Sequence, residues 1–498
     1  MGIGRLGPLE RRGWSLRNTN PTLDGDDGAW LGTGWLVRAI VDAVEFLPAD
    51  QVPAALRAAL TDRMLGELKL MQRDWQTKRP WYVSAEAVQS NQWILPNEAM
   101  VRACLFLGRG RSDPAYELGV QNLLRSLDYQ GAQGEFVEGL HYSSISVTSL
   151  YSIARATARA GDRRLIAHPF LRKYPTWLAH HFQPGGFIIN CFDAPATARG
   201  MLQRDQALFA VGAIVSGNPH ALWSLQTRAR FGPTVDGILA ACLPPQAAEA
   251  PPLFAAYPQA TRLNWRSSWD DDQATGLWLR GGHSTDFHDH MDRGHVNFVI
   301  GNQPLLIEAG IQSYATPTFH THMWTVAGHN VLQIGSAPPE RLLAKLLLQA
   351  GQILNADERQ APITVERMDE DGGSASVDLS RCYRNISKWV RHVEWDRKRV
   401  IIKDTVELPA DNILQFRWHL GVPMSVARHE APGEIIAGPV RLSYQASSLV
   451  SAVVEGMPDA TLERGVITEH ACVVVRTVDR VRALELVTQV GLVDAIKE

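Results

Sequence analysis

Histidine is concentrated in one short stretch of this 498-residue chain. Seven of the 16 histidines lie within residues 283–329, and the densest part is Phe287-His288-Asp289-His290-Met291-Asp292-Arg293-Gly294-His295. If this segment is extended, His288, His290 and Asp292 project from the same side. Such side chains can serve as a base, a metal ligand and an orienting carboxylate. A solvated loop that happens to be rich in histidine is the alternative, but so many histidines beside expected strands favour a functional site.

Two later segments add groups that suit a metal ion. Leu305–Ala309 reads as an apolar strand that carries Glu308, and His329 follows about twenty residues later. Together with His290, these side chains would give zinc three protein ligands and leave one position open. Because the three residues are far apart in the chain, their spacing alone leaves the presence of a metal undecided.

The N-terminal half contains two polar segments beside expected helices. Ser90-Asn91-Gln92-Trp93 precedes an amphipathic helix expected from Asn97, and the glycine-bounded loop 134–143 carries Glu138, His141 and Tyr142. Taken alone, each segment is more typical of a helix cap and a turn than of a site. They become candidates only in combination with the histidine-rich stretch.

Helices are expected throughout the first half. A 3.6-residue apolar period predicts Ala29–Leu47, Val52–Gln72, Asn97–Gly108, Tyr116–Tyr129, Val147–Arg159, Pro175–Phe182, Gln206–Val215, Pro219–Ala229 and Val235–Cys242. Their short connections suit antiparallel pairs. We therefore predict a helical domain over residues 1–250, with about nine helices.

Beyond a proline-rich linker at Leu243–Thr261, the apolar period becomes two. This pattern predicts strands at Thr275–Gly281, Val296–Gly301, Leu305–Ala309, Lys388–Asp396, Arg399–Leu408, Ile413–Leu420, Val440–Gln445, Ala471–Thr477 and Ala483–Val490. Many strands joined by short turns indicate an antiparallel β-sandwich over residues 251–498.

Composition excludes several classes of protein. With 49 basic and 52 acidic residues and 45% hydrophobic residues, the chain is neither a strongly basic nucleic-acid binder nor a disordered acidic protein. No apolar run reaches the length of a membrane-spanning helix, and five scattered cysteines argue against a disulfide framework. Residues 1–27 lack the apolar stretch of a signal peptide, so we expect a cytoplasmic protein, or a periplasmic or secreted one if a leader has been removed.

Several motifs resemble those of the heparinase II/III-like polysaccharide lyases. In the sheet half they are Arg266-Ser267-Ser268-Trp269, His288-Asp289-His290-Met291-Asp292, Leu306-Ile307-Glu308-Ala309-Gly310, His329-Asn330, Arg391-His392-Val393 and Ile402-Lys403-Asp404-Thr405-Val406. In the helical half, the loop with Glu138, Gly139 and Tyr142 is similar to another family motif. The resemblance implies an incomplete (α/α) toroid followed by an antiparallel β-sandwich, that is, an α+β multidomain fold.

The resemblance also implies an activity, the cleavage of a uronate-containing polysaccharide or oligosaccharide by β-elimination. Such an enzyme must neutralise the C6 carboxylate, remove the C5 proton and protonate the leaving oxygen at C4. The matching groups are Asn91 or Gln92 for the carboxylate, and Tyr142 and His288 for the proton transfers. We favour Tyr142 as the acid, whereas either residue could be the base. Glu138, His141, Arg266, Trp93 and Trp324 are candidates for substrate binding.

Two positions depart from the family pattern. Asn91-Gln92 stands where the family usually has Asn-His, and Glu308 replaces an Asp at a metal-ligand position. Zinc held by His290, Glu308 and His329 would be structural, since it would fix the loop that carries His288. The expected partner is an acidic polysaccharide or oligosaccharide, and we expect binding to neither nucleic acid nor membrane. The sequence does not indicate the oligomeric state. A glycoside hydrolase and a non-catalytic carbohydrate-binding protein are the alternative functions.

Overall fold

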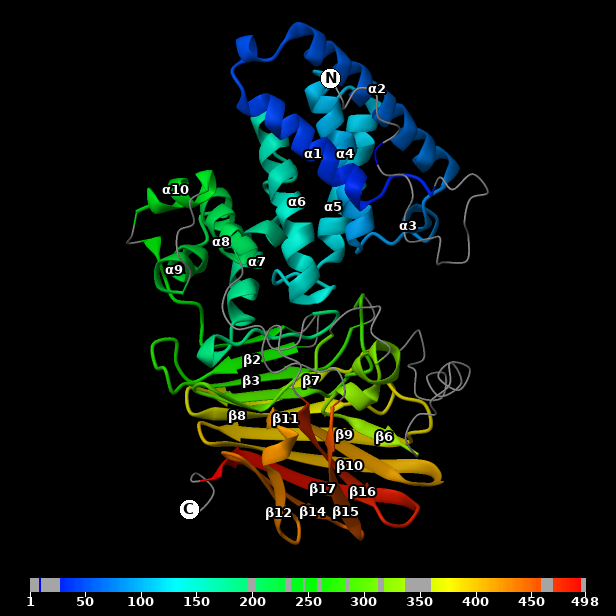
Figure 1. The fold of residues 1–498 in the computed structure, drawn as a ribbon, viewed down its shortest axis with the longest axis vertical. Coiled ribbons are helices and arrows are strands. Elements are labelled where there is room, and N and C mark those ends of the chain that lie inside the picture. The colour runs from blue at the N-terminus through cyan, green and yellow to red at the C-terminus, as the bar shows by residue number, and fades with distance from the viewer. Residues whose placement is uncertain are drawn as a thin grey trace.

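The computed structural model describes residue 9 and residues 27–194, 203–228, 234–244, 247–257, 262–283, 286–311, 318–335, 360–457 and 469–493. Helices form one end of the molecule and two antiparallel sheets form the other (Figure 1). The predicted fold class, a helical toroid-like region followed by a β-sandwich, is confirmed.

The helical half contains ten α-helices within the described residues. They are α1 (Leu31–Phe46), α2 (Ala54–Thr77), α3 (Trp81–Ser84), α4 (Asn91–Phe106), α5 (Pro114–Tyr129), α6 (Gly139–Arg159), α7 (Pro169–His180), α8 (Gln203–Ser216), α9 (Pro219–Thr227) and α10 (Val235–Ala241). Helix α4 packs against α1, α2, α5 and α6 and is buried along most of its length. It is therefore the centre of the helical core.

Local capping decides where several of these helices begin. Asp113, Asn218 and Thr234 accept hydrogen bonds from the first turns of α5, α9 and α10. Ser90 caps α4 by accepting from the amide of Trp93, so α4 begins six residues before the predicted start at Asn97. The polar segment 91–93 thus forms the first turn of α4 and does not precede the helix.

Two sheets form the other half. The first contains β1 (Phe254–Tyr257), β2 (Arg262–Arg266), β3 (Thr275–Arg280), β4 (Val296–Ile300), β5 (Gln303–Leu306), β11 (Leu414–Pro423), β16 (His470–Thr477) and β15 (Val450–Gly456) in that spatial order, with β6 (Leu332–Ile334) paired to β11. The second has the order β12 (Ala427–Ala431), β13 (Glu434–Ala437), β14 (Val440–Ala446), β17 (Val481–Leu492), β10 (Arg399–Asn412), β9 (Lys388–Asp396), β8 (Gly372–Asp378) and β7 (Ile363–Asp369).

The hydrophobic core of the sandwich lies between these sheets. Trp265, Phe298 and Trp418 from the first sheet belong to one buried cluster with Trp389 and Trp395 from the second. Strand β9 alternates between buried and more exposed residues, as expected for a sheet with one solvated face. Strands β2 and β3 are buried at every residue, because the helical half covers their other face (Figure 1).

The predicted strands are largely present, but several observed strands, among them β2, β7 and β8, were not predicted, and two local assignments are wrong. Strand β1 lies inside the segment that we predicted to be a linker, Leu243–Thr261, and it pairs with β2 at the start of the first sheet. Strand β5 ends at Leu306, so Glu308 lies beyond the strand that was expected to carry it. None of the described helices is long and apolar enough to cross a membrane.

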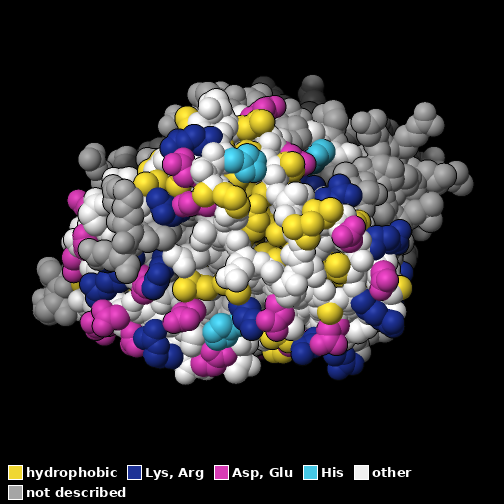
Figure 2. All heavy atoms as spheres, turned by 90° about the horizontal axis from the view of Figure 1, so that it is seen from below, with side chains coloured by type: hydrophobic (Ala, Val, Ile, Leu, Met, Phe, Trp, Pro, Cys, Tyr) yellow, Lys and Arg dark blue, Asp and Glu magenta, His cyan; other side chains and the backbone are white. Residues whose placement is uncertain are grey.

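Hydrogen bonds join the two halves along their junction. The amide of Asn264 in β2 donates to the carbonyl of His180, and the N–H of Phe287 donates to the carbonyl of Val137. Viewed from the sheet end, acidic and basic side chains are intermingled (Figure 2). This face therefore offers no broad basic surface for a nucleic acid.

Candidate functional site

The two histidines of the His288–Asp292 motif share one carboxylate from the helical half. Asp193 contacts His288 Nδ1 at 2.6 Å through one oxygen and His290 Nε2 at 3.0 Å through the other. Burial alone would raise the pKa of Asp193, but the hydrogen bonds to both imidazoles outweigh it and lower that pKa. Asp193 is therefore an anion that fixes the orientation of both rings.

His288 also faces two groups that precede or begin α6. Its ring stacks on the ring of Tyr142, with centroids 3.8 Å apart and planes inclined by 10°. Its Nε2 lies 3.5 Å from Oε1 of Glu138. His288 has a φ of 54°, in the left-handed region that few non-glycine residues adopt.

Glu138 is completely buried beneath His288. Burial, reinforced by the charge of Asp193, raises the pKa of Glu138 well above its usual value, although the main-chain amide of Asn91 works in the opposite direction. Neither carboxylate oxygen makes a hydrogen bond of normal geometry. Burial thus favours the protonated form of the Glu138 carboxyl group.

The amides of Asn91 and Gln92 lie in the first turn of α4, and Asn91 adjoins Glu138. The side-chain oxygens of Asn91 and Gln92 are buried and lack hydrogen-bond partners among the described residues. A buried amide oxygen without a donor costs free energy, which a ligand hydroxyl that donates to it would recover. Tyr142, His288, Glu138 and Asn91 therefore form one group, which we call the proton-transfer group.

A second group lies on the other side of Asp193. One ligand atom from each of His290, Glu308 and His329 lies within 4.8 Å of the others, and all three residues are buried. His329 Nδ1 is 2.7 Å from Glu308 Oε1, without the geometry of a hydrogen bond. The structure thus brings together the three residues that the sequence assigned to a metal.

The chemistry of these side chains fits a bound cation. His290 Nδ1, both nitrogens of His329 and both oxygens of Glu308 are buried without hydrogen-bond partners. Although burial favours the neutral acid, the neighbouring His329, His295 and His290 lower the pKa of Glu308 to about 2. A fixed carboxylate beside two unpartnered imidazole nitrogens is a donor set that a divalent metal would satisfy.

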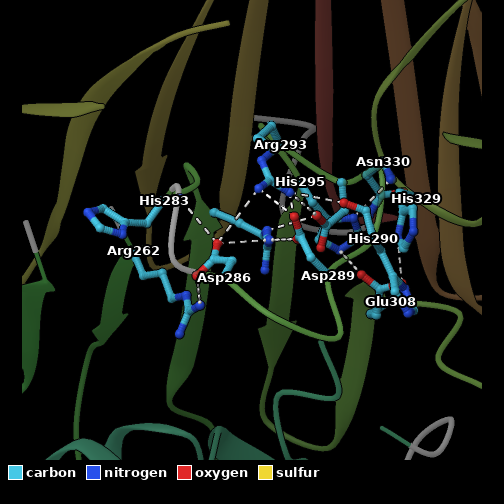
Figure 3. A network of polar contacts seen from close by, with 12 residues as sticks. Arg262, His283, Asp286, Asp289, His290, Arg293, His295, Glu308, His329 and Asn330 are labelled. Carbon is cyan, nitrogen blue, oxygen red and sulfur yellow. Dashed lines mark hydrogen bonds and ion pairs between the residues drawn. The ribbon is translucent and has the colours of Figure 1, made fainter. Parts of the chain in front are cut away.

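Arginines and aspartates on one side of this metal group hold the histidine loop in place (Figure 3). Arg280 pairs with Asp286, Asp289 and Asp292, and Arg293 contacts Asp289 at 2.5 Å. Asp292 therefore faces Arg280, whereas His288 and His290 face Asp193. The expectation that the three motif residues share one side is wrong, because the backbone is not extended at His288.

The downstream motif residues support the same loop from the second sheet. Arg391 on β9 forms a buried pair with Asp404 on β10, and its Nη1 donates to the carbonyls of Gly294 and Asn330. The side chain of Asn330 donates to the carbonyls of Val296 and Ile307. These residues position the site and do not line it.

The other residues predicted to bind substrate lie in different places relative to the site. Trp93 is 1% exposed, and its Nε1 donates to the carbonyl of Asn122, so it cannot offer an indole face to a sugar and that prediction is wrong. His141 lies edge-on to Tyr142, and half-buried Trp324 donates to the carbonyl of Asp289, so both adjoin the site. Arg266 contacts none of these residues and lines a separate pocket.

Asp193 is the functional residue that the sequence did not reveal. It follows Phe192, whose φ of 63° turns the chain sharply, and Phe192 packs against Gly139 where a Cβ would lie 2.6 Å from its ring. An isolated Asp in an irregular segment has no distinguishing pattern. Only the fold shows that it bridges two histidines 95 and 97 residues away.

Comparison with known proteins agrees with this architecture. Residues 263–481 match the family model described as heparinase II/III-like, C-terminal. Among solved structures, a heparinase III is similar over 96% of this chain and 72% of its own, with a TM-score of 0.68 and 13% identity. A heparan sulfate lyase from Pedobacter heparinus is similar over 96% and 71%, with a TM-score of 0.63 and 15% identity.

The match with the family model covers residues 263–481, and there the resemblance found in the sequence is confirmed. At these identities, the solved structures establish the fold alone. No curated protein matches the chain.

Proposed function

We propose that this protein is a polysaccharide lyase that cleaves an acidic, uronate-containing saccharide by β-elimination. The proposal rests above all on the proton-transfer group. An imidazole from the sheet half, oriented by Asp193, lies against a phenol and a buried carboxyl group with a raised pKa from the helical half, and Asn91 adjoins that carboxyl group. These are the groups that such an elimination requires.

His288 and Tyr142 carry the two proton transfers in this proposal. If His288 Nδ1–H donates to Asp193, the lone pair of Nε2 is available to take the C5 proton. Tyr142 serves as the acid that protonates O4, since a phenol of ordinary pKa is protonated at neutral pH. Asp193 sets the tautomer of His288 through the contact with Nδ1.

The substrate carboxylate requires hydrogen-bond donors that stabilise the developing enolate. The amide groups of Asn91 and Gln92 donate without carrying charge. Glu138, kept protonated by its burial, can donate a further hydrogen bond to the same carboxylate. The site thus offers neutral donors to an anion, which avoids the penalty of an unpaired buried charge.

We propose zinc as the ion for His290, Glu308 and His329. When bound, it would act as a positive centre that holds three separate chain segments together. The residues themselves link it to catalysis, because His290 shares Asp193 with His288. The role that follows is structural support for the base.

A lyase assay tests the function. The full chain is incubated separately with heparan sulfate, chondroitin, hyaluronan and alginate, and the ultraviolet absorbance of the unsaturated ends is followed. Absorbance that rises with one or more of these polymers is expected. Reducing ends that form without absorbance would identify a hydrolase, and binding without either product would identify a carbohydrate-binding protein.

A further inference from the structure

A pocket separate from the proton-transfer group lies where the two halves meet. It has a volume of about 270 Å³ and is lined from the helical side by the end of α7, the turn at 183–186 and α9. From the sheet side it is lined by the end of β2 and the connection to β3. Neither the proton-transfer group nor the metal group contributes a lining residue.

An arginine without an acidic partner forms the deep end of this pocket. Arg266 is 6% exposed, and its Nε and Nη1 donate to the carbonyls of Ser268 and Phe182. Burial and the charge of Arg228 lower the pKa of Arg266 to about 9, so it remains protonated near neutral pH. Among the described residues no carboxylate pairs with it, and a buried unpaired charge is costly unless a ligand neutralises it.

Aromatic rings form the walls beside this charge. The guanidinium of Arg266 lies 3.7 Å from the ring centroid of Trp269, and Trp223 meets Trp269 edge-on at 5.1 Å. Arg228 lies 5.5 Å from the ring of Trp223 and forms no ion pair within the described ranges. The pocket therefore combines two unpaired guanidinium groups with two indoles.

The linker between the halves makes this arrangement rigid. Trp269 Nε1 donates to the carbonyl of Pro251 at 2.6 Å, and the ring of His180 stacks on Trp269. His180 in turn contacts the carbonyl of Pro252. The side chain of Trp269 is thus already ordered before a ligand binds, so binding would cost little of its conformational entropy.

Acidic residues occur only toward the outside of the pocket. Asp271 and Asp272 line it, but both side chains are exposed to solvent, which screens their charge. Asp270 and Asp272 act on Arg228 through space without forming an ion pair. Arg266 is therefore the buried positive charge of the pocket, while Arg228, Asp271 and Asp272 are exposed at its rim.

We infer that this pocket binds the carboxylate or sulfate of one acidic sugar unit. Arg266 and Arg228 would hold the anion, and the half-buried indole of Trp223 would pack against the apolar face of the ring. The volume suits a single unit, since it lies just below the range of about 300–1,000 Å³ for ordinary ligand pockets. The inference that the pocket binds an anion depends only on the residues of the pocket. The inference that this anion belongs to a saccharide rests on the proposed function.

Calorimetric titration of the full chain tests this inference. The protein carries Tyr142→Phe so that a bound saccharide is not cleaved, and the probes are a sulfated uronate disaccharide, inorganic sulfate and uncharged cellobiose. Arg228→Gln is expected to weaken disaccharide binding at least tenfold, as for the loss of a charge-assisted hydrogen bond. Trp223→Ala should also weaken it.

Arg125→Gln is the matched control, because Arg125 also lies over an indole, that of Trp93, but outside the pocket. It should leave the affinity unchanged. Equal affinity in Arg228→Gln, or loss of binding in His288→Ala alone, would overturn the inference. If sulfate bound as tightly as the disaccharide, the assignment of the pocket to a saccharide would be overturned. If uncharged cellobiose bound as tightly as the disaccharide, the requirement for an anionic group would be overturned. Pocket binding in the Tyr142→Phe protein, together with no lyase product from the unaltered protein, would refute the proposed function but not the anion site in the pocket.

Discussion

Glu138 and Glu308 are both completely buried, and neither carboxylate makes a normal hydrogen bond with the described residues. Burial favours the neutral acid in both places. Beside Glu138 the charge of Asp193 adds to that effect and the pKa rises, whereas beside Glu308 three histidines reverse it and lower the pKa to about 2. The neighbouring residues thus favour the protonated acid at Glu138 and the carboxylate anion at Glu308.

The two glutamates therefore suit different roles in two regions, the proton-transfer group around Glu138 and the metal group around Glu308. A protonated carboxyl group suits the recognition of an anionic substrate, and an unpartnered carboxylate among imidazoles suits a metal ion. Asp193 joins the regions, since its two oxygens contact His288 and His290. Variants should therefore separate into those that affect catalysis, those that affect metal binding and one that affects both.

The largest effect should come from Tyr142→Phe in the region of Glu138. Loss of the phenolic proton removes the general acid, and kcat should fall about 10²–10⁴-fold while the unfolding temperature stays the same. Initial rates of ultraviolet absorbance measure this change. Tyr444→Phe on β14 is the control and should retain full activity. A fully active Tyr142→Phe protein would remove Tyr142 from the mechanism.

Asp193→Asn should disturb both regions at once. An amide cannot accept hydrogen bonds from both imidazoles through two oxygens, so activity and zinc affinity should each fall about 10–100-fold. Rates and zinc titrations are measured on the same preparation. Asp128→Asn, which alters an exposed Asp–His contact, is the matched control. If only one of the two readouts changed, Asp193 would not couple the regions.

Glu308→Gln should act on the metal alone. Zinc at 100 times its dissociation constant is expected to stabilise the unaltered protein by about 2.7 kcal/mol and to leave Glu308→Gln unaffected. Thermal unfolding with and without zinc measures the difference. Glu138→Gln, which changes an equally buried glutamate, should still respond to zinc. Stabilisation of Glu308→Gln by the same amount would exclude Glu308 as a ligand.

Glu138→Gln should have the smallest effect, and one that depends on pH. A raised carboxyl pKa stabilises the folded state fully below the unfolded value of about 4.5, and this stabilisation disappears as the pH rises through the folded-state pKa. The unaltered protein should therefore lose stability relative to Glu138→Gln between pH 4.5 and 8. Unfolding temperatures across this range measure it, with exposed Glu394→Gln as the control. A constant difference would mean that Glu138 is ionised in the folded protein.

Much of the fold could be predicted from periodicity, and the misses have physical causes. Strand β9 has the predicted bounds, because one of its faces is buried and the other is more exposed. Strand β2 was missed although polar and apolar residues alternate along it, since its five residues directly follow the segment that we predicted to be a linker. The start of α4 was misplaced because the cap at Ser90 precedes residues that look like a polar loop.

The candidate site was predictable only where the sequence has a distinctive pattern. His288, His290, Glu308 and His329 were recognised from the density of histidines in residues 283–329 and the glutamate among them, and their motifs also resemble those of a known family. Asp193 was not, because its role depends on two left-handed residues, Phe192 and His288, and on a contact across 95 residues. Trp93 was misassigned, since its sequence neighbours are polar while its indole packs edge-on against Trp75.

The proline-rich segment between the halves has a consequence for dissecting the protein. The carbonyl of Pro251 accepts a hydrogen bond from Trp269 of the sheet half, and the carbonyl of Pro252 contacts His180 of the helical half, so the segment packs against both halves. A polypeptide cut at residue 250 would leave His180 without its carbonyl partner and its stacked indole. Separately expressed halves would thus each expose surface that is buried in the intact chain, and we expect each half to be less stable than the same region in the intact protein.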